Sequence, residues 1–159
     1  MNKILFFLIG LLALPVSAEQ YDAVIPIHEK GASTFYIKGR LGNLAYADFM
    51  VDTGSGYLVI NQESLAQLRK GGQADYKRDI KGILANGDEF SVAVWRISSL
   101  TINDQCVLHD VDAAVFPGKT RQILGLTALK KAAPFTLSFD PPQIVLSHCA
   151  HVSYLVTSP

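Results

Sequence analysis

The stretch FMVDTGSGYLVI, residues 49–60, places a single acidic side chain between two apolar runs. An ionised carboxylate that enters an apolar layer costs several kcal/mol unless it is hydrogen-bonded or shares its charge. Asp52 is therefore either satisfied by backbone groups of an ordinary turn or kept for chemistry. Because a second apolar strand follows at Tyr57–Ile60, we expect the loop between the two strands to lie inside the molecule or at an interface.

The first 18 residues are typical of a secretory signal peptide. A basic start, Met1–Lys3, is followed by the apolar run Ile4–Leu14 and by the small residues of Val16–Ala18. The run is too short for a bilayer span, which takes about 20 residues, and an uncleaved anchor is the alternative. We expect a secreted, periplasmic chain that starts at Glu19 and keeps no stable membrane anchor once the signal is removed.

Charge and cysteine content limit the partners and cofactors. The chain has 14 basic and 14 acidic side chains, and this balance argues against nucleic acid or an anionic membrane surface as the main partner. Cys106 and Cys149 are its two cysteines. In an oxidising compartment they suggest one disulfide, with two buried free thiols as the alternative. Four metal ligands at workable spacing are not visible around His148–His151, so we expect no metal and no other cofactor.

The rest of the chain is a series of short strands joined by turn signals. Apolar alternation predicts strands at 34–41, 44–51, 57–60, 80–84, 89–97, 100–102, 106–116, 135–139 and 144–146. Turns are predicted at Gly42-Asn43, Asn86-Gly87 and Asn103-Asp104. Helices are predicted at 62–68, capped by Asn61, and at 126–132, before Pro134. The pattern indicates a mainly β fold, a small closed barrel or sandwich with one or two short helices.

Three motifs in a fixed order make the chain similar to the retropepsin-like aspartic peptidases, half-length relatives of the pepsin fold. The first is the hairpin that ends in Val51–Ser55, and the second is a central hairpin at 83–90, where the family carries its flap. The third is Ile123–Leu126, where the family has an apolar-apolar-Gly motif that opens its helix. The resemblance covers residues 34–147 and implies a small closed barrel of the retropepsin type. The N-terminal segment 19–33 and the tail 148–159 lie outside it.

The resemblance implies a role for each residue of the active-site loop. Asp52 would be the catalytic carboxylate. Thr53 would hydrogen-bond across a subunit interface, and Gly54 would bring its backbone N–H up to the carboxylate without a side chain in the way. Ser55 would support the acid from its outer side.

Two further groups follow from the same resemblance. The tip of the flap would consist of Ala85, Asn86 and Gly87. A structural group packed beneath the active-site loop would consist of Ile123, Leu124 and Gly125.

One chain supplies half of such a site. Nine other Asp residues occur, and none of them is followed by Thr-Gly or Ser-Gly. Two carboxylates a few ångströms apart cannot both ionise, so they share one proton. One would take a proton from water while the other stabilises the oxygen of the attacked carbonyl. A peptidase of this kind should therefore be a two-fold homodimer that acts on a peptide or protein substrate, with Asp52 and its mate at the axis.

Three other interpretations of the sequence predict different properties. A non-catalytic peptide- or partner-binding module on the same fold would keep the groove without the chemistry. A structural β-domain, in which Asp-Thr-Gly is only a turn, would persist as a monomer. An OB-type barrel would carry a basic or aromatic strand face, which this near-neutral chain does not show.

Overall fold

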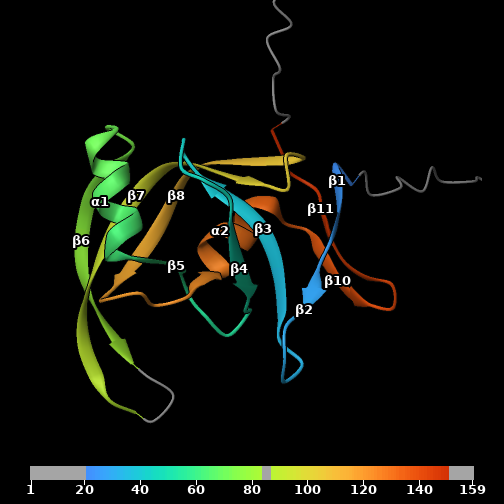
Figure 1. Ribbon diagram of the computed structural model, residues 1–159, viewed down its shortest axis with the longest axis horizontal. Coiled ribbons are helices and arrows are strands. Elements are labelled where there is room, and N and C mark those ends of the chain that lie inside the picture. Colours follow the sequence, from blue (N-terminus) through green and yellow to red (C-terminus); the bar gives the residue numbers. More distant parts are fainter. Residues whose placement is uncertain (1–20, 84–86, 151–159) are drawn as a thin grey trace, which may run out of the picture.

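The computed structural model describes residues 21–83 and 87–150, which form two β-sheets and two short α-helices (Figure 1). The elements in chain order are β1 (Ala23–Pro26), β2 (His28–Glu29), β3 (Phe35–Leu41), β4 (Ala47–Val51), β5 (Leu58–Asn61), α1 (Gln62–Lys70), β6 (Ala74–Ile83), β7 (Glu89–Ile102), β8 (Cys106–Phe116), β9 (Gln122–Leu124), α2 (Leu126–Leu129), a 3₁₀ turn (Lys130–Ala132), β10 (Phe135–Phe139) and β11 (Pro142–Leu146). The predicted signal peptide and most of the predicted tail lie outside the described residues, and the predicted domain boundaries stay predictions.

A closed ring of strands forms the body of the molecule. The larger sheet has the order β2-β3-β4-β9-β5-β8-β7-β6, and β3 also pairs with β7 from Gly39↔Ile102 to Leu41↔Leu100. This additional pairing joins the two ends of the run from β3 to β7. At Gly39 a Cβ atom would lie 2.8 Å from the ring of Phe49, so a glycine is needed there for the buried phenylalanine to pack. The predicted mainly β fold class is confirmed.

A second, smaller sheet joins the two ends of the described chain. Its order is β1-β11-β10, and β1 pairs antiparallel with β11 from Ala23↔Leu146 to Pro26↔Gln143. In β1 the alternate residues Ala23 and Ile25 are buried while Val24 is 52% exposed, so one face of the strand packs on the core. Part of the segment 19–33, which the family resemblance did not cover, is therefore a strand of this sheet.

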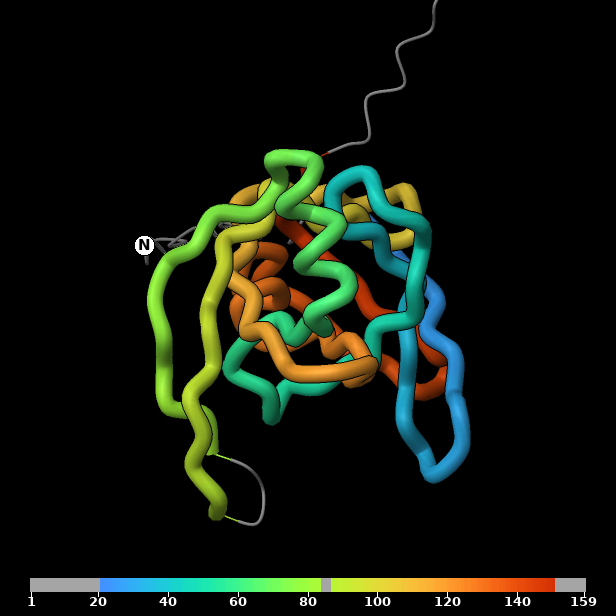
Figure 2. The backbone as a smooth tube through the Cα atoms, turned by 60° about the vertical axis from the view of Figure 1, so that its left-hand side comes forward, coloured from blue at the N-terminus to red at the C-terminus, as the bar shows by residue number. Residues whose placement is uncertain are grey.

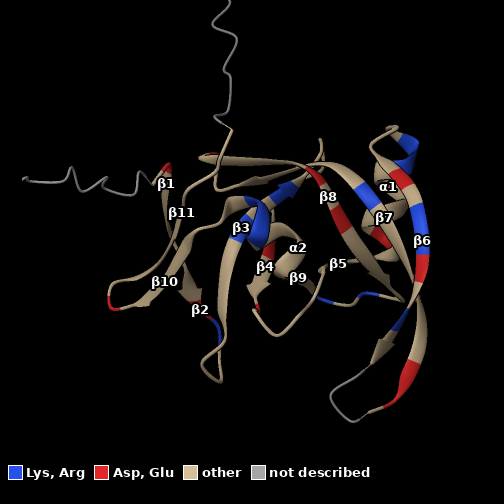
Figure 3. Ribbon diagram, turned by 180° about the vertical axis from the view of Figure 1, so that it is seen from behind, with Lys and Arg blue, Asp and Glu red and all other residues tan. Residues whose placement is uncertain are grey.

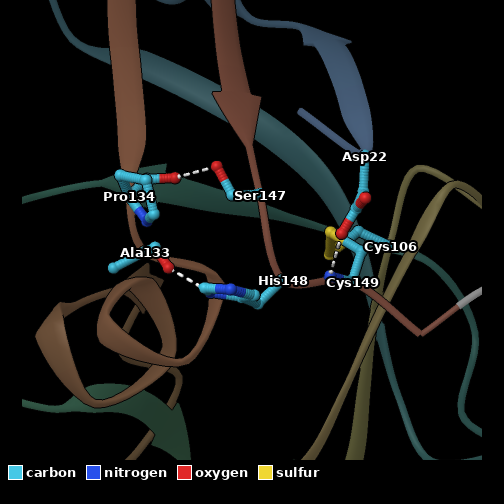
Figure 4. Close-up of a disulfide and its surroundings, with 7 residues drawn as sticks. All are labelled: Asp22, Cys106, Ala133, Pro134, Ser147, His148 and Cys149. Atoms are coloured by element: carbon cyan, nitrogen blue, oxygen red, sulfur yellow. Dashed lines mark hydrogen bonds between the residues drawn. A yellow bond between two sulfur atoms is a disulfide. The ribbon is translucent and has the colours of Figure 1, made fainter. Parts of the chain in front are cut away.

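The predicted disulfide between Cys106 and Cys149 is confirmed (Figure 4). It links the fully buried first residue of β8 to the segment after β11. Close to it, the backbone N–H of Cys149 donates to Oδ2 of Asp22 at 2.9 Å. The Ser147 hydroxyl donates to the carbonyl of Pro134 at 2.6 Å. These contacts hold both described ends of the chain against the body.

The first hairpin differs from its prediction in length. A turn forms at Gly42-Asn43, with Gly42 at φ +49° and the Leu44 N–H donating to the carbonyl of Leu41 at 2.9 Å. The returning strand, however, begins at Ala47 rather than at residue 44. The reason is that β3 runs on past β4 to pair with β7, so its last residues have no partner in β4.

The central hairpin is longer than predicted, because β6 begins at Ala74 rather than at Ile80 and β7 runs unbroken to Ile102. The additional part of β6 is rich in charged residues (Figure 3), as is common in an edge strand, and lacks apolar alternation. β7 pairs with β8 only as far as Ala93↔Val115, whereas β6 and β7 stay paired to Ile83↔Glu89. The hairpin therefore extends past the end of β8 (Figure 2).

Both predicted helices are present. Asn61 caps α1 by accepting a hydrogen bond from the Ser64 N–H at 2.9 Å, as the sequence predicted. The second predicted helix consists of α2 and the 3₁₀ turn, which ends at Ala132, two residues before Pro134. Within residues 21–83 and 87–150, no helix is long and apolar enough to cross a membrane.

Candidate active site

Asp52 lies directly after β4, where backbone groups determine its position. Its N–H donates to the carbonyl of Leu124 at 3.2 Å, and its Oδ1 accepts a hydrogen bond from the Gly54 N–H at 2.8 Å. A Cβ atom on Gly54 would stand 3.1 Å from the same oxygen, so glycine permits the close approach. Asp52 is half-buried, while Thr53 and Gly54 are exposed. In a single chain this loop thus lies at the surface, which fits the expected interface rather than the interior.

The loop after Asp52 is seated on the start of α2. The Ser55 hydroxyl donates to the carbonyl of Tyr57 at 2.9 Å, and the Leu126 N–H donates to the carbonyl of Ser55 at 2.9 Å. A Cβ atom on Gly125 would lie 2.0 Å from the Tyr57 carbonyl oxygen, so only glycine fits there. The side chain of Ser55 thus holds the loop through the carbonyl of Tyr57, and its support of the Asp52 carboxylate stays a prediction.

Strand β9 and a threonine support the loop from below. β9 runs parallel to β4, with Ile123 opposite Met50 and Leu124 opposite Val51. The Thr127 hydroxyl accepts a hydrogen bond from the Leu58 N–H and donates one to the Asp112 carbonyl, each at 2.7 Å. Sequence reasoning missed Thr127. Its signal was a polar side chain in an otherwise apolar helix.

A pocket of about 250 Å³ separates the active-site loop from the central hairpin, and we call it the hairpin pocket. Tyr57 lines its loop side and Lys81 its hairpin side. Its apolar walls include Val59, Ile80, Phe90, Val92 and Ala114. It has the size and lining to take an apolar side chain of a peptide.

A second pocket, of about 400 Å³, opens beside Asp52 on the other side of the loop, and we call it the Asp52 pocket. Its lining is largely apolar and includes Met50, Leu137, Phe35 and Phe139. The rings of Phe35 and Phe139 lie 4.9 Å apart, and Phe139 is 61% exposed. An exposed apolar surface of this kind is typical of an interaction site.

Asp48 and Asp52 come from the same strand region but differ in their surroundings. Lys30 donates a hydrogen bond to Oδ2 of Asp48, and Lys38 Nζ lies 2.8 Å from Oδ1 as an ion pair. These contacts, with Lys30 first, hold the pKa of the Asp48 carboxyl below its ordinary value. Within the described part of the chain, Asp52 takes part in no ion pair. Asp48 is thus held by charged side chains, whereas the contact to the Asp52 carboxylate among the described residues comes from its own loop.

A closed β ring with an Asp-Thr-Gly loop seated on an apolar-apolar-Gly helix start defines the aspartic protease class. Residues 37–131 match the family described as "gag-polyprotein putative aspartyl protease". The chain belongs to this family of retropepsin-like aspartyl proteases.

Among solved structures, the fold is similar to the crystal structure of a retropepsin-like aspartic protease from Rickettsia conorii. The TM-score is 0.54 and the sequence identity is 20%, over 82% of this chain and 92% of that chain. Among proteins with curated descriptions, none matches the chain.

The structure brings most of the predicted site residues together. Asp52, Gly54 and Ser55 lie on the structural group Ile123–Gly125, and Thr53 is exposed beside them. Of the predicted flap tip, Gly87 has φ +91°, and Ala85 and Asn86 lie outside the described residues. The functional roles of all these residues stay predictions.

Proposed function

We propose that this protein is an aspartic endopeptidase whose active site forms when two copies bring their Asp52 carboxylates together. The observation that carries the proposal is the half-exposed Asp52, held by the Gly54 N–H at 2.8 Å in a chain of the aspartyl protease family. The chemistry of this class needs two such acids. Because one chain offers a single Asp-Thr-Gly loop, the second acid must come from a second chain.

Hydrolysis then follows from the paired carboxylates. They share one proton, because both cannot be ionised at close range. The ionised member takes a proton from a water molecule, whose oxygen attacks the peptide carbonyl carbon. The protonated member donates its proton to the carbonyl oxygen. As the tetrahedral intermediate collapses, the carboxylate that is now ionised takes a proton from one of the intermediate's hydroxyl groups and the other carboxyl gives its proton to the nitrogen. The C–N bond breaks, the amine leaves, and the pair again shares one proton.

The surface around Asp52 supports a two-fold dimer. The Asp52 pocket carries exposed apolar side chains, among them Phe139, that a second copy would cover. Thr53, next to the carboxylate, is exposed and free to meet its counterpart. An isologous interface centred on this loop would bring each Asp52 next to its mate, which gives one site per dimer.

An extended peptide or protein segment is the substrate that this site suits. The hairpin pocket lies directly beside the active-site loop and has apolar walls. A peptide held in extended form between loop and hairpin would make main-chain hydrogen bonds and place side chains in such pockets. The proposed reaction draws on no metal or cofactor.

We also propose that the enzyme is secreted to the periplasm after removal of residues 1–18. The Cys106–Cys149 disulfide supports this, because such bonds persist in oxidising compartments. Fractionation of cells that express the full chain tests it. Processed protein in the periplasmic fraction, with Glu19 at its N-terminus, is the expected result, and unprocessed protein in the cytoplasm would contradict it.

The decisive test of the activity compares residues 19–159 with the Asp52→Asn variant on a mixed peptide library. Cleavage is read by mass spectrometry from acidic to neutral pH. We expect cleavage by the unmodified chain and none by Asp52→Asn. Asp110→Asn is the matched control, because Asp110 is exposed and its φ of +55° suits asparagine equally well.

Two results would overturn the proposal. A folded, dimeric chain that binds peptides without cleaving them would be the non-catalytic binding module. A stable monomer without activity would indicate that the Asp-Thr-Gly loop is only a turn.

A further inference from the structure

The outer half of the central hairpin has little support from the sheet. Beyond Ala93↔Val115, β7 has lost β8 as a neighbour, and β6 is an edge strand. An apolar contact reaches back to the body, where the rings of Phe90 and Phe116 lie 5.2 Å apart, edge to face. A polar contact lies at the base of this outer half. Nη2 of Arg78 donates to the hydroxyl of Tyr57 at 3.0 Å.

The Tyr57 end of this polar contact is rigidly held. Its carbonyl is wedged against Gly125 and accepts the Ser55 hydroxyl at 2.9 Å. The next residue, Leu58, is fully buried and donates its N–H to Thr127. The phenol of Tyr57 therefore projects from a fixed point of the active-site loop.

The Arg78 end lies where the hairpin leaves the sheet. Arg78 is opposite Val94, and Val94 is paired with Ala114 of β8, one pair before the β7–β8 pairing ends. The register of β6 shifts between Tyr76 and Arg78, so the strand bends at this position. Figure 2 shows β6 and β7 running side by side into the part of the hairpin that extends past the rest of the sheet. The contact thus lies at the base of the part of the hairpin that does not pair with β8.

We propose that Arg78 is a positioning residue, and that its bridge to the Tyr57 hydroxyl sets the distance between the central hairpin and the active-site loop. This inference rests on the proposed function where it concerns substrate. Tyr57 lines one side of the hairpin pocket, and Ile80 and Phe90 of the hairpin line the other. The bridge spans the same two elements, so it determines the width of the pocket and with it the affinity for peptide. Loss of the bridge should therefore change KM rather than kcat.

The test uses Tyr57→Phe, which removes only the hydroxyl, together with Arg78→Gln and the double variant. Each single variant should raise KM about 3- to 10-fold, the range of a partly exposed hydrogen bond to a charged group, with kcat within about twofold. The double variant should be no worse than either single one, because both remove the same bridge. Arg78→Lys, which keeps the positive charge and a long side chain that can donate, should recover part of the affinity. Lys77→Gln is the charge-matched control on the exposed neighbouring residue and should leave KM unchanged.

A second measurement decides the bridge without any activity. Hydrogen exchange of the backbone amides in Ile80–Ile83 and Glu89–Val92 should be about 3- to 10-fold faster in Tyr57→Phe and Arg78→Gln, and unchanged in Lys77→Gln. Exchange in β8 should not change. Unaltered exchange in the hairpin, or effects of the two single variants that multiply in the double variant, would overturn the inference. If no form of the chain cleaves peptide, the proposed function fails while the exchange data still decide the bridge.

Discussion

A Cβ atom on Gly125 would stand 2.0 Å from the carbonyl oxygen of Tyr57 and 2.8 Å from that of Ser55. The backbone of the active-site loop thus rests directly on the residue that opens α2, with no room for a side chain between them. Gly125 has φ −100°, which any residue can adopt. Glycine is required at this position because there is no space for a side chain, and not because of the backbone conformation.

Gly125→Ala should therefore displace the active-site loop. We expect a loss of about 2–4 kcal/mol in the free energy of unfolding, because neither backbone carbonyl can move without breaking its neighbours' hydrogen bonds. Urea unfolding measures this loss. Gly56→Ala, in the same loop with nothing within 4 Å of the added atom, should unfold almost like the unmodified chain. Equal stability of the two variants would show that the close contact is unimportant.

Opening the disulfide should weaken the fold. The bond closes a separation of 43 residues, so Cys149→Ser should lower the free energy of unfolding by about 2–4 kcal/mol. Unfolding curves with and without a reductant provide the measurement. Reductant should destabilise the unmodified chain by a similar amount and leave Cys149→Ser unaffected. If reductant also destabilised Cys149→Ser, its effect on the unmodified chain would have a cause other than the disulfide.

Asp48 should make stability depend on pH. The contacts with Lys30 and Lys38, with Lys30 first, lower the pKa of its carboxyl below the ordinary 3.8. The ionised group therefore stabilises the folded chain at pH values above about 4, and this stabilisation is lost as the pH falls through the lowered pKa. Asp48→Asn should cost about 0.5–1 kcal/mol near pH 7 and less near pH 2. Urea unfolding of the variant and the unmodified chain at both pH values tests this. An equal loss of stability at the two pH values would contradict it.

Mixed subunits should reveal whether two chains share one site. After exchange between equal amounts of unmodified and Asp52→Asn chains, about a quarter of the dimers carry two Asp52 residues. The mixture should then show about half the activity of the same amount of unmodified chain alone. Mixing with Asp110→Asn should cause no such loss. Activity that is unaffected by Asp52→Asn would mean that each chain works independently.

Local signals in the sequence predicted local structure correctly. The Asn103-Asp104 turn has positive φ at both residues, +48° and +55°, and these residue types tolerate that conformation. The cap of α1 by Asn61 depends on three residues of spacing and was likewise predictable. In the same way, the order of residues from Asp52 to Ser55 was enough to identify the candidate loop.

Contacts between distant parts of the chain were not predictable. Two such contacts join strands that are far apart in sequence, namely Ala23 with Leu146 and Gly39 with Ile102. The residue pattern of a strand does not specify the strand with which it pairs. The start of β6 was missed because its residues are mostly charged, as is common in an edge strand. They therefore lack the alternation of apolar and polar residues that predicts a strand. The bond between Arg78 and Tyr57 depends on where two elements meet, which composition and spacing do not specify.

The small sheet has a consequence for how such a dimer would be controlled. Its strands β1, β11 and β10 all come from one chain, and the Cys106–Cys149 bond holds the segment that follows β11. In the described part of the chain the small sheet thus takes no strand from a second copy, and association in the proposed dimer would join two chains that are already folded. A lone chain would stay folded but idle, so the amount of working enzyme would follow the square of the protein concentration when dilute. The concentration of the chain, rather than its folding, would then control the activity.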